Sequence, residues 1–95
     1  MNNIYILQQY LRNNLIFSKY NLNRVGIFGS FARDEENAGD IDILIEDDID
    51  PDELIQLKMT IEKSFQKKVD IVLAKFANPI ILYRAKKDLH YATRD

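Results

Sequence analysis

Three aspartates in apolar runs are the residues of this chain whose types and spacing best fit a chemical role. Asp40 and Asp42 open the run "DIDILIE", and Asp70 interrupts the run "VDIVLA". Because side chains alternate along a strand, Asp40 and Asp42 would share one face, opposite the isoleucines. Carboxylate oxygens without histidine or cysteine suit a hard cation, and Mg²⁺ needs few of them because it shares its shell with water and phosphate. The three carboxylates therefore fit a magnesium site.

A glycine and a serine at the end of an earlier apolar run supply the complementary half. Gly29 and Ser30 follow "NRVGIF", a run typical of a short buried strand. Glycine lets the backbone approach a phosphate closely, and the start of a helical turn offers free N–H groups to it. Taken alone, the two aspartates of "DID" also fit a solvated strand edge, and the glycine–serine pair could occur by chance. Together, a carboxylate cluster and an anion cradle favour phosphoryl or nucleotidyl transfer.

The surrounding patterns predict the elements that must position these residues. Helical spacing of apolar residues predicts a first helix over residues 3–18. Asp50 as a cap, Pro51 at the first helical position and Glu53 as the partner of a capping box predict the start of a second helix, which ends near Lys67. A third helix is expected to start at Asn78 and Pro79, with Leu82 and Ala85 facing inward; strands are expected at 25–29, 41–46, 69–74 and 89–92.

This order predicts an α/β (α+β) fold, with a small mixed sheet of three to four strands and helices on one face. The segment between Asp42 and Asp70 contains a helix, so their strands can lie parallel. About ten residues join the first two strands, which leaves antiparallel pairing open. The 95 residues are expected to form a single domain, residues 1–95.

Charge is unevenly distributed although the net charge is only −2. Residues 34–53 carry eleven acidic and no basic residues, whereas residues 1–33 carry four basic and no acidic ones. Such an acidic block can hold cations while its surroundings attract phosphate, and a solvated acidic loop is the alternative. The chain has no cysteine, which excludes thiolate metal sites, and no signal peptide is apparent. We therefore expect a cytoplasmic protein without membrane contact.

The motif set "IFGSFARD", "AGDIDILIE" and "KVDIVLA" resembles the nucleotidyltransferase superfamily related to the DNA polymerase beta palm. Within that superfamily it most resembles the minimal nucleotidyltransferases (MNT), the antitoxins of HEPN/MNT toxin–antitoxin pairs. The family pattern is a strand, then G-S-x-A-R-G, a loop, [ST]-D-x-D, and a third carboxylate on a later strand. The resemblance covers residues 24–92, nearly the whole chain.

The resemblance implies roles for individual residues. Asp40, Asp42 and Asp70 would be the catalytic, metal-binding carboxylates, with Asp70 serving a second Mg²⁺ and the attacking group. Gly29 and Ser30 would hold the nucleotide phosphates. Arg33 is placed with them in the nucleotide site, although a structural ion pair is the favoured alternative for its side chain.

Two residues depart from the family pattern. Asp34 stands where the pattern usually has glycine, and Gly39 stands where it usually has serine or threonine. Asp34 would add negative charge beside a phosphate loop unless it points away. Gly39 lacks a hydroxyl that could steady Asp40. Both departures bear on the efficiency of catalysis more than on the fold.

The resemblance implies Mg²⁺-dependent transfer of AMP from ATP to a protein acceptor, a HEPN-domain RNase toxin. The chain is too short to carry its own acceptor-binding domain, so a partner must deliver the acceptor. The alternative is an inactive binding module that neutralises a toxin by covering it. No direct contact with nucleic acid is expected, and homo- and hetero-oligomers both stay open.

Overall fold

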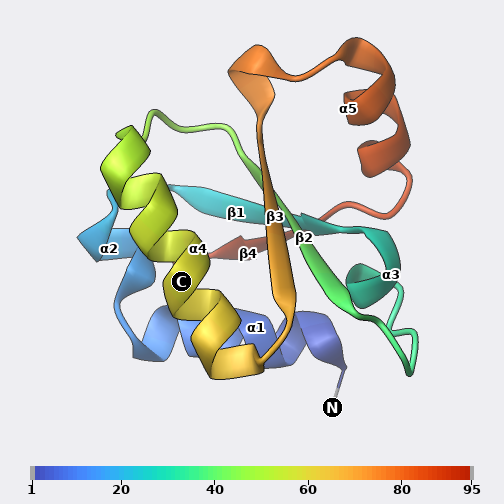
Figure 1. Cartoon of the computed structure of the whole chain (residues 1–95), viewed down its shortest axis with the longest axis horizontal. Coiled ribbons are helices and arrows are strands. Elements are labelled where there is room, and N and C mark those ends of the chain that lie inside the picture. Colours follow the sequence, from blue (N-terminus) through green and yellow to red (C-terminus); the bar gives the residue numbers. More distant parts are fainter. Residues whose placement is uncertain (1, 95) are drawn as a thin grey trace.

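The protein forms a four-stranded mixed sheet with helices packed against it, as the computed structural model shows for residues 2–94 (Figure 1). The strand order is β3-β2-β1-β4. In chain order the elements are α1 (Asn3–Asn13), α2 (Ile16–Lys19), β1 (Arg24–Phe28), α3 (Gly29–Ala32), β2 (Asp40–Ile45), α4 (Pro51–Phe65), β3 (Lys68–Leu73), a 3₁₀ helix η1 (Ala74–Phe76), α5 (Pro79–Lys86) and β4 (His90–Thr93).

The sheet combines two kinds of strand pairing. Strand β1 pairs antiparallel with both β2 and β4, and β2 pairs parallel with β3. The parallel pair is the one whose connection contains α4, as expected for a crossover. The predicted mixed sheet is therefore confirmed, and the pairing of β1 with β2, which the sequence left open, is antiparallel.

One face of the sheet carries the main core. Ile41, Ile43 and Ile45 of β2 are at most 1% exposed, as their alternation with the aspartates predicts. They pack with Leu7 and Leu57 in a single cluster that α1, α4 and the sheet enclose. Burial of apolar surface in this layer, at about 25 cal/mol per Å², is the main force that holds the strands in register.

The other face of the sheet is covered only in part, by α5. Leu44 and Ala85 are buried but lie outside the main core cluster. A side chain at Gly26 would meet both Leu44 and Leu89, so these leucines lie over β1 on the face opposite Ile27. Figure 1 shows α5 on the far side of the sheet from α1 and α4. The helices are thus not all on one face, because Leu44 needs its own apolar cover.

Some helix boundaries differ from the prediction. The first helix breaks at Leu15, which adopts a left-handed conformation with φ 57° and is 67% exposed, so it is not a core residue. The break lets Ile16 and Phe17, adjacent in sequence, both turn into the core. Pro51 begins α4 as predicted, but the Asp50 side chain makes no capping hydrogen bond, and α4 ends at Phe65.

The third helix follows the prediction more closely. Asn78 caps α5 by accepting a hydrogen bond from the N–H of Ile80 at 2.8 Å. Ala85 is buried and Leu82 is half-buried, as expected for inward-facing positions. Between Asn2 and Arg94, none of the helices has the length and apolar character needed to cross a membrane.

Candidate active site

The parallel pairing of β2 and β3 places two of the predicted carboxylates side by side. Asp42 is the register partner of Asp70, and both are half-buried. Neighbouring strands lie about 4.8 Å apart, so these two side chains leave the sheet next to each other. Asp40 lies on the same face two residues earlier and is exposed. The structure therefore brings the three aspartates to one end of the sheet face that α5 leaves open.

Asp42 is the most electrostatically strained of the three. Burial raises the pKa of its carboxyl group, the negative charges of Asp70 and Asp40 raise it further, and Arg33 opposes the shift. Both main causes disfavour the ionised form, and a cation between Asp42 and Asp70 would relieve both. The local electrostatics therefore favour a bound cation at this position.

The strain at Asp42 gives a prediction for the metal-free protein. A carboxyl whose pKa is raised on folding destabilises the folded state at neutral pH, and the penalty disappears as pH falls below the unfolded-state pKa of about 3.9. Asp42→Asn should therefore raise the melting temperature by a few degrees at pH 7 and progressively less at lower pH. Thermal melts from pH 4 to pH 8 in chelator would measure this, with exposed Glu36→Gln as the control. An Asp42→Asn variant no more stable than wild type at pH 7 would contradict it.

The backbone at Gly29 lies so close to the Asp42 carboxylate that it leaves no room for a side chain. Its φ is +75°, a left-handed conformation that other residues rarely adopt, and a Cβ built there would overlap Oδ2 of Asp42. The strand β1 ends at Phe28, the register partner of Asp42, so the chain turns into α3 directly beside this carboxylate. The predicted strand end at Gly29 is therefore one residue late, and Gly29 opens the helix instead.

The first turn of α3 faces the same end of the sheet. Ser30 is half-buried and is the second residue of this short helix. The first N–H groups of any helix have no partner within the helix, so the backbone around Ser30 can donate to an anion. The structure thus places Gly29 and Ser30 beside Asp42, as a phosphate cradle would require, while phosphate binding by them stays a prediction.

Arg33 is engaged in ion pairs. Its guanidinium donates to Glu35 at 2.6 Å and to Asp88 at 2.6 Å, and these hydrogen bonds raise its pKa above the ordinary value. The pair with Asp88 ties α3 to the segment before β4. The alternative given for Arg33, a structural ion pair, is what the structure shows. Phosphate binding by this side chain would have to use the N–H groups that these two pairs do not occupy.

The two departures from the family pattern have local explanations. Asp34 has φ 63°, the left-handed conformation that explains why glycine is usual there. Its carboxylate accepts a hydrogen bond from the N–H of Asn3 at 2.8 Å, so it points toward the start of α1 and away from the cradle. Gly39 has open space around its Cβ position, so a serine would fit without a clash.

A pair of substitutions at Asp34 separates backbone strain from the hydrogen bond to Asn3. Asp34→Ala should destabilise the protein by about 1–2 kcal/mol, because alanine tolerates the left-handed conformation poorly and cannot accept the hydrogen bond. Asp34→Gly loses the same hydrogen bond but relieves the strain, so its stability should stay within about 0.5 kcal/mol of wild type. Urea denaturation measures both. Equal loss in the two variants would show that the hydrogen bond, not the backbone, dominates.

Sequence reasoning did not single out three residues that support the site. Lys67 donates from Nζ to the carbonyl of Ala38, which anchors the loop that leads into Asp40. Lys68 is the register partner of Asp40. Its Nζ lies 3.8 Å from Oδ1 of Asp70, and this exposed ion pair is expected to be weak. Asp88 fixes Arg33, as described above. The adjacent lysines before Asp70 were the only sequence signal for any of them.

The donor set fits a magnesium ion that is shared with a ligand and not one enclosed by protein alone. Within residues 2–94, no three acidic or histidine side chains lie close enough to hold a metal ion together. Two neighbouring carboxylates, Asp42 and Asp70, and a third on the same face are nonetheless oxygen ligands of the kind Mg²⁺ prefers. Phosphate and water would have to complete such a shell. Asp40, Asp42 and Asp70 as metal ligands therefore stay a prediction.

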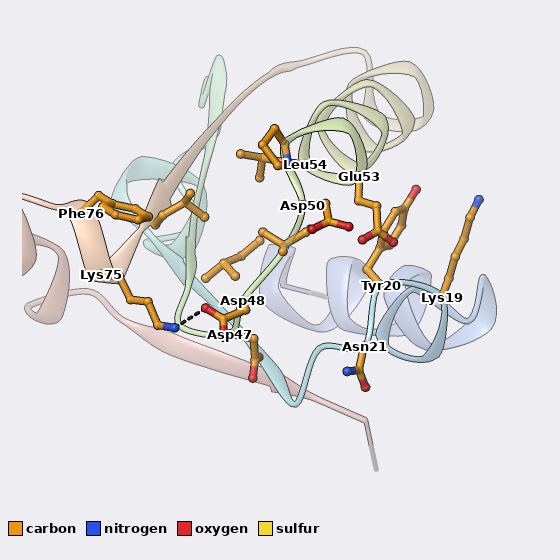
Figure 2. A pocket seen from close by; sticks show the side chains of 14 residues that line it. Lys19, Tyr20, Asn21, Asp47, Asp48, Asp50, Glu53, Leu54, Lys75 and Phe76 are labelled. Atoms are coloured by element: carbon orange, nitrogen blue, oxygen red, sulfur yellow. Dashed lines mark hydrogen bonds and ion pairs between the residues drawn. The ribbon is translucent and has the colours of Figure 1, made fainter.

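A cavity of about 560 Å³ lies at the opposite end of the sheet, near Ile45 and Leu73 at the ends of β2 and β3. Figure 2 shows acidic side chains at its rim, and Lys75 pairs with Asp48 there. None of the residues predicted for the active site lines this cavity. The predicted active site is thus the open face beside Gly29 and not this cavity. Fourteen residues line this cavity: Lys19, Tyr20, Asn21, Ile45, Asp47, Asp48, Ile49, Asp50, Pro51, Glu53, Leu54, Leu73, Lys75 and Phe76.

The sequence of this chain is similar to a nucleotidyltransferase family and to a protein named as an adenylyltransferase. The family model "Polymerase beta, Nucleotidyltransferase" matches residues 8–90. The chain is 35% identical over 69 residues to the "Putative protein adenylyltransferase MJ0435" of Methanocaldococcus jannaschii, an alignment that covers 70% of this chain and 74% of that protein.

Solved structures agree on the fold. A toxin–antitoxin complex with AMP-PNP aligns with a TM-score of 0.66 at 22% identity, covering 97% of this chain and 73% of the other. The complex of the tri-AMPylated HEPN toxin of Shewanella oneidensis with its MNT antitoxin aligns with a TM-score of 0.59 at 22% identity, covering 90% and 71%. The family match over residues 8–90 and the relative that is 35% identical show that this protein belongs to the polymerase beta nucleotidyltransferase family.

Proposed function

We propose that this nucleotidyltransferase moves AMP from ATP to a hydroxyl group of a protein acceptor in the cytoplasm. The single observation that carries the proposal is the pairing of Asp42 with Asp70 on an open sheet face beside the Gly29 turn. The name of the M. jannaschii relative and the AMP-PNP complex among the structural neighbours support ATP as the donor. The AMPylated HEPN toxin in another neighbour supports a HEPN-domain toxin as the acceptor, with this chain as its antitoxin.

Each residue of the site has a defined part in this proposal. Asp40 and Asp42 would hold the Mg²⁺ that accompanies the triphosphate, and Asp70 would serve a second Mg²⁺ and the acceptor. Mg²⁺, when bound, offsets the charge of the phosphates. The backbone at Gly29 and Ser30 would orient the phosphates of ATP. Direct binding of nucleic acid has no part in this proposal.

The proposed transfer exchanges one phosphorus–oxygen bond for another. The acceptor oxygen forms a bond to the α-phosphorus while the bond from that phosphorus to the bridging oxygen breaks, and pyrophosphate leaves. In this proposal Asp70 would accept the proton of the acceptor hydroxyl. The half-buried position of Asp70 beside Asp42 keeps it on the face from which an acceptor would approach.

A second candidate function is supported by a specific observation. Because no three carboxylates within the described residues form a ready metal cluster, and Arg33 is held in ion pairs, the chain could act as a binding module that covers a toxin without modifying it. The two candidates differ in whether the isolated chain binds nucleotide in a metal-dependent way.

Thermal melts of the isolated chain test the proposed function. Millimolar ATP with Mg²⁺ should raise the melting temperature, because a ligand at 100 times its Kd stabilises the folded state by about 2.7 kcal/mol. ATP with chelator should have little effect, and Asp42→Ala should respond to neither. A wild-type melting temperature that ignores ATP and Mg²⁺ would favour the binding module.

A further inference from the structure

The most exposed apolar surface of the molecule lies on η1 and α5. Four large apolar side chains within eight residues are exposed to solvent. We call them the α5 face; they are Phe76 at 83%, Ile80 at 61%, Ile81 at 47% and Tyr83 at 68% exposure. Several large apolar side chains exposed on one short segment are typical of a site of protein interaction.

The fold itself does not require these side chains to be apolar. The helix α5 buries only Ala85 fully, and Asn78 already caps its start. Ile80 and Tyr83 are one turn apart, on a side of α5 that faces solvent. An isoleucine or tyrosine side chain exposed to water does not stabilise the folded chain. Burial against another protein would explain why apolar residues occupy these positions.

Charge around the α5 face narrows the choice of occupant. The helix has no acidic residue, and none of its cations, Arg84 and Lys86, or Lys87 just after it, forms an ion pair within residues 2–94. Lys87 lies over the ring of Tyr83, 5.2 Å from its centroid. The surface therefore fits a protein with an apolar centre and an acidic rim. The aliphatic side chains at 80 and 81 fit a protein better than a nucleic acid.

The α5 face is joined to the candidate active site. Asp88, two residues after α5, pairs with Arg33 at the end of α3, the helix that Gly29 opens. Leu89 packs near Leu44, which lies two residues along β2 from Asp42. The body of α3 packs into the main core through Phe31, so it is the Arg33–Asp88 pair at its end that reaches the segment after α5. A protein seated on α5 would therefore extend over the carboxylates.

We propose that the α5 face is the docking surface for the protein acceptor of the transferred nucleotide. This proposal rests on the proposed function for the identity of the occupant. The open carboxylate face supplies one wall of an active site, and a docked acceptor would supply the other wall and bring its hydroxyl group to Asp70.

Two double variants test the docking surface. Ile80→Ser with Tyr83→Ser removes the apolar centre of the α5 face, and the matched control is Ile55→Ser with Met59→Ser, an exposed apolar pair on α4 at 56% and 62% exposure. The partner to be used is a HEPN-domain protein identified by a search of the genes that neighbour the gene for this chain. Its Kd, measured by calorimetry without nucleotide, should rise at least about tenfold for the α5 variant and less than about twofold for the control. Melting temperatures verify that both variants are folded.

Kinetics of AMP transfer separate docking from catalysis. The KM for the acceptor should rise with Kd in the α5 variant, while kcat at saturating acceptor and the affinity for ATP stay at wild-type values. If wild type binds the partner through α5 but adds no AMP, the proposed function fails and the docking surface survives. The docking proposal would be overturned if the α5 variant bound the partner as tightly as wild type. It would also be overturned if both double variants lost the same affinity for the partner, or if wild type did not bind the partner. A wild-type homodimer that the α5 variant converts to monomer while partner affinity is kept would overturn it as well.

Discussion

Replacing Asp70 with asparagine is expected to lower the rate of AMP transfer by about 10²- to 10⁴-fold while leaving most of the affinity for ATP intact. Asp70 lies on β3, next to Asp42. Strand β2 separates it from β1 and from the Gly29 turn that would hold the phosphates. The part of Asp70 is therefore expected to concern the acceptor more than the nucleotide. Single-turnover transfer and equilibrium ATP binding, measured on the same variant, separate the two effects.

Asp40→Asn is the comparison for Asp70→Asn. Asp40 and Asp42 share one strand and one face, so loss of either should weaken both nucleotide binding and transfer. The asparagine side chain has almost the same volume as aspartate. Asp40 is exposed and Asp70 only half-buried, so folding should survive both changes. Equal loss of ATP affinity in the Asp40 and Asp70 variants would contradict this division of roles.

Gly29→Ala is expected to reduce transfer by about 100-fold or more at a modest cost in stability. The left-handed backbone at Gly29 should cost an alanine about 1–2 kcal/mol. The added Cβ would overlap Oδ2 of Asp42, and the carboxylate can avoid it only by rotating away from its present position. Misplacement of a reacting group by about 1 Å can cost about 100-fold in rate. Transfer rates and urea denaturation measure the two effects separately.

Gly39→Ala is the matched control for Gly29→Ala. Both are glycine-to-alanine changes near the carboxylates, but a Cβ at Gly39 meets nothing within 4 Å, and Gly39 does not have a positive φ. Stability and transfer should therefore stay close to wild type. A Gly29→Ala protein with wild-type transfer would show that the position of the Asp42 carboxylate is not critical.

Alternation along the strands made much of this site predictable from sequence. The isoleucines that alternate with Asp40, Asp42 and Leu44 could be buried only if the aspartates faced the other way, and the structure confirms this arrangement. The helix between β2 and β3 made their parallel pairing foreseeable, and that pairing sets Asp42 beside Asp70. Period-two burial and a crossover helix are local signals, so no long-range information was needed.

Contacts between distant segments were not predictable. The pairing of Arg33 with Asp88 joins residues 55 positions apart, and the hydrogen bond from Asn3 to Asp34 joins residues 31 positions apart. No spacing in the sequence encodes either contact, because each depends on how whole elements pack. The same reason made the position of Leu89, which lies near Leu44 on the carboxylate face, unpredictable from the sequence.

The break at Leu15 had a different cause. The apolar spacing of Ile4, Leu7, Leu11 and Leu15 suggested one continuous helix, yet Ile16 and Phe17 bury instead of Leu15. Helical periodicity places only one face toward the core, so two adjacent buried residues required a change of direction. At Leu15, tertiary packing therefore overrode the helical pattern of the sequence.

The most direct test of the central claim is the mass of the acceptor after reaction. The HEPN-domain protein used for the docking experiment would be incubated with this chain, Mg²⁺ and ATP, and its intact mass then measured. The account predicts an increase by the mass of AMP, which Asp42→Ala abolishes while the complex still forms. Unmodified acceptor with wild-type chain, together with full toxin neutralisation by Asp42→Ala, would contradict nucleotidyl transfer and establish neutralisation by binding alone.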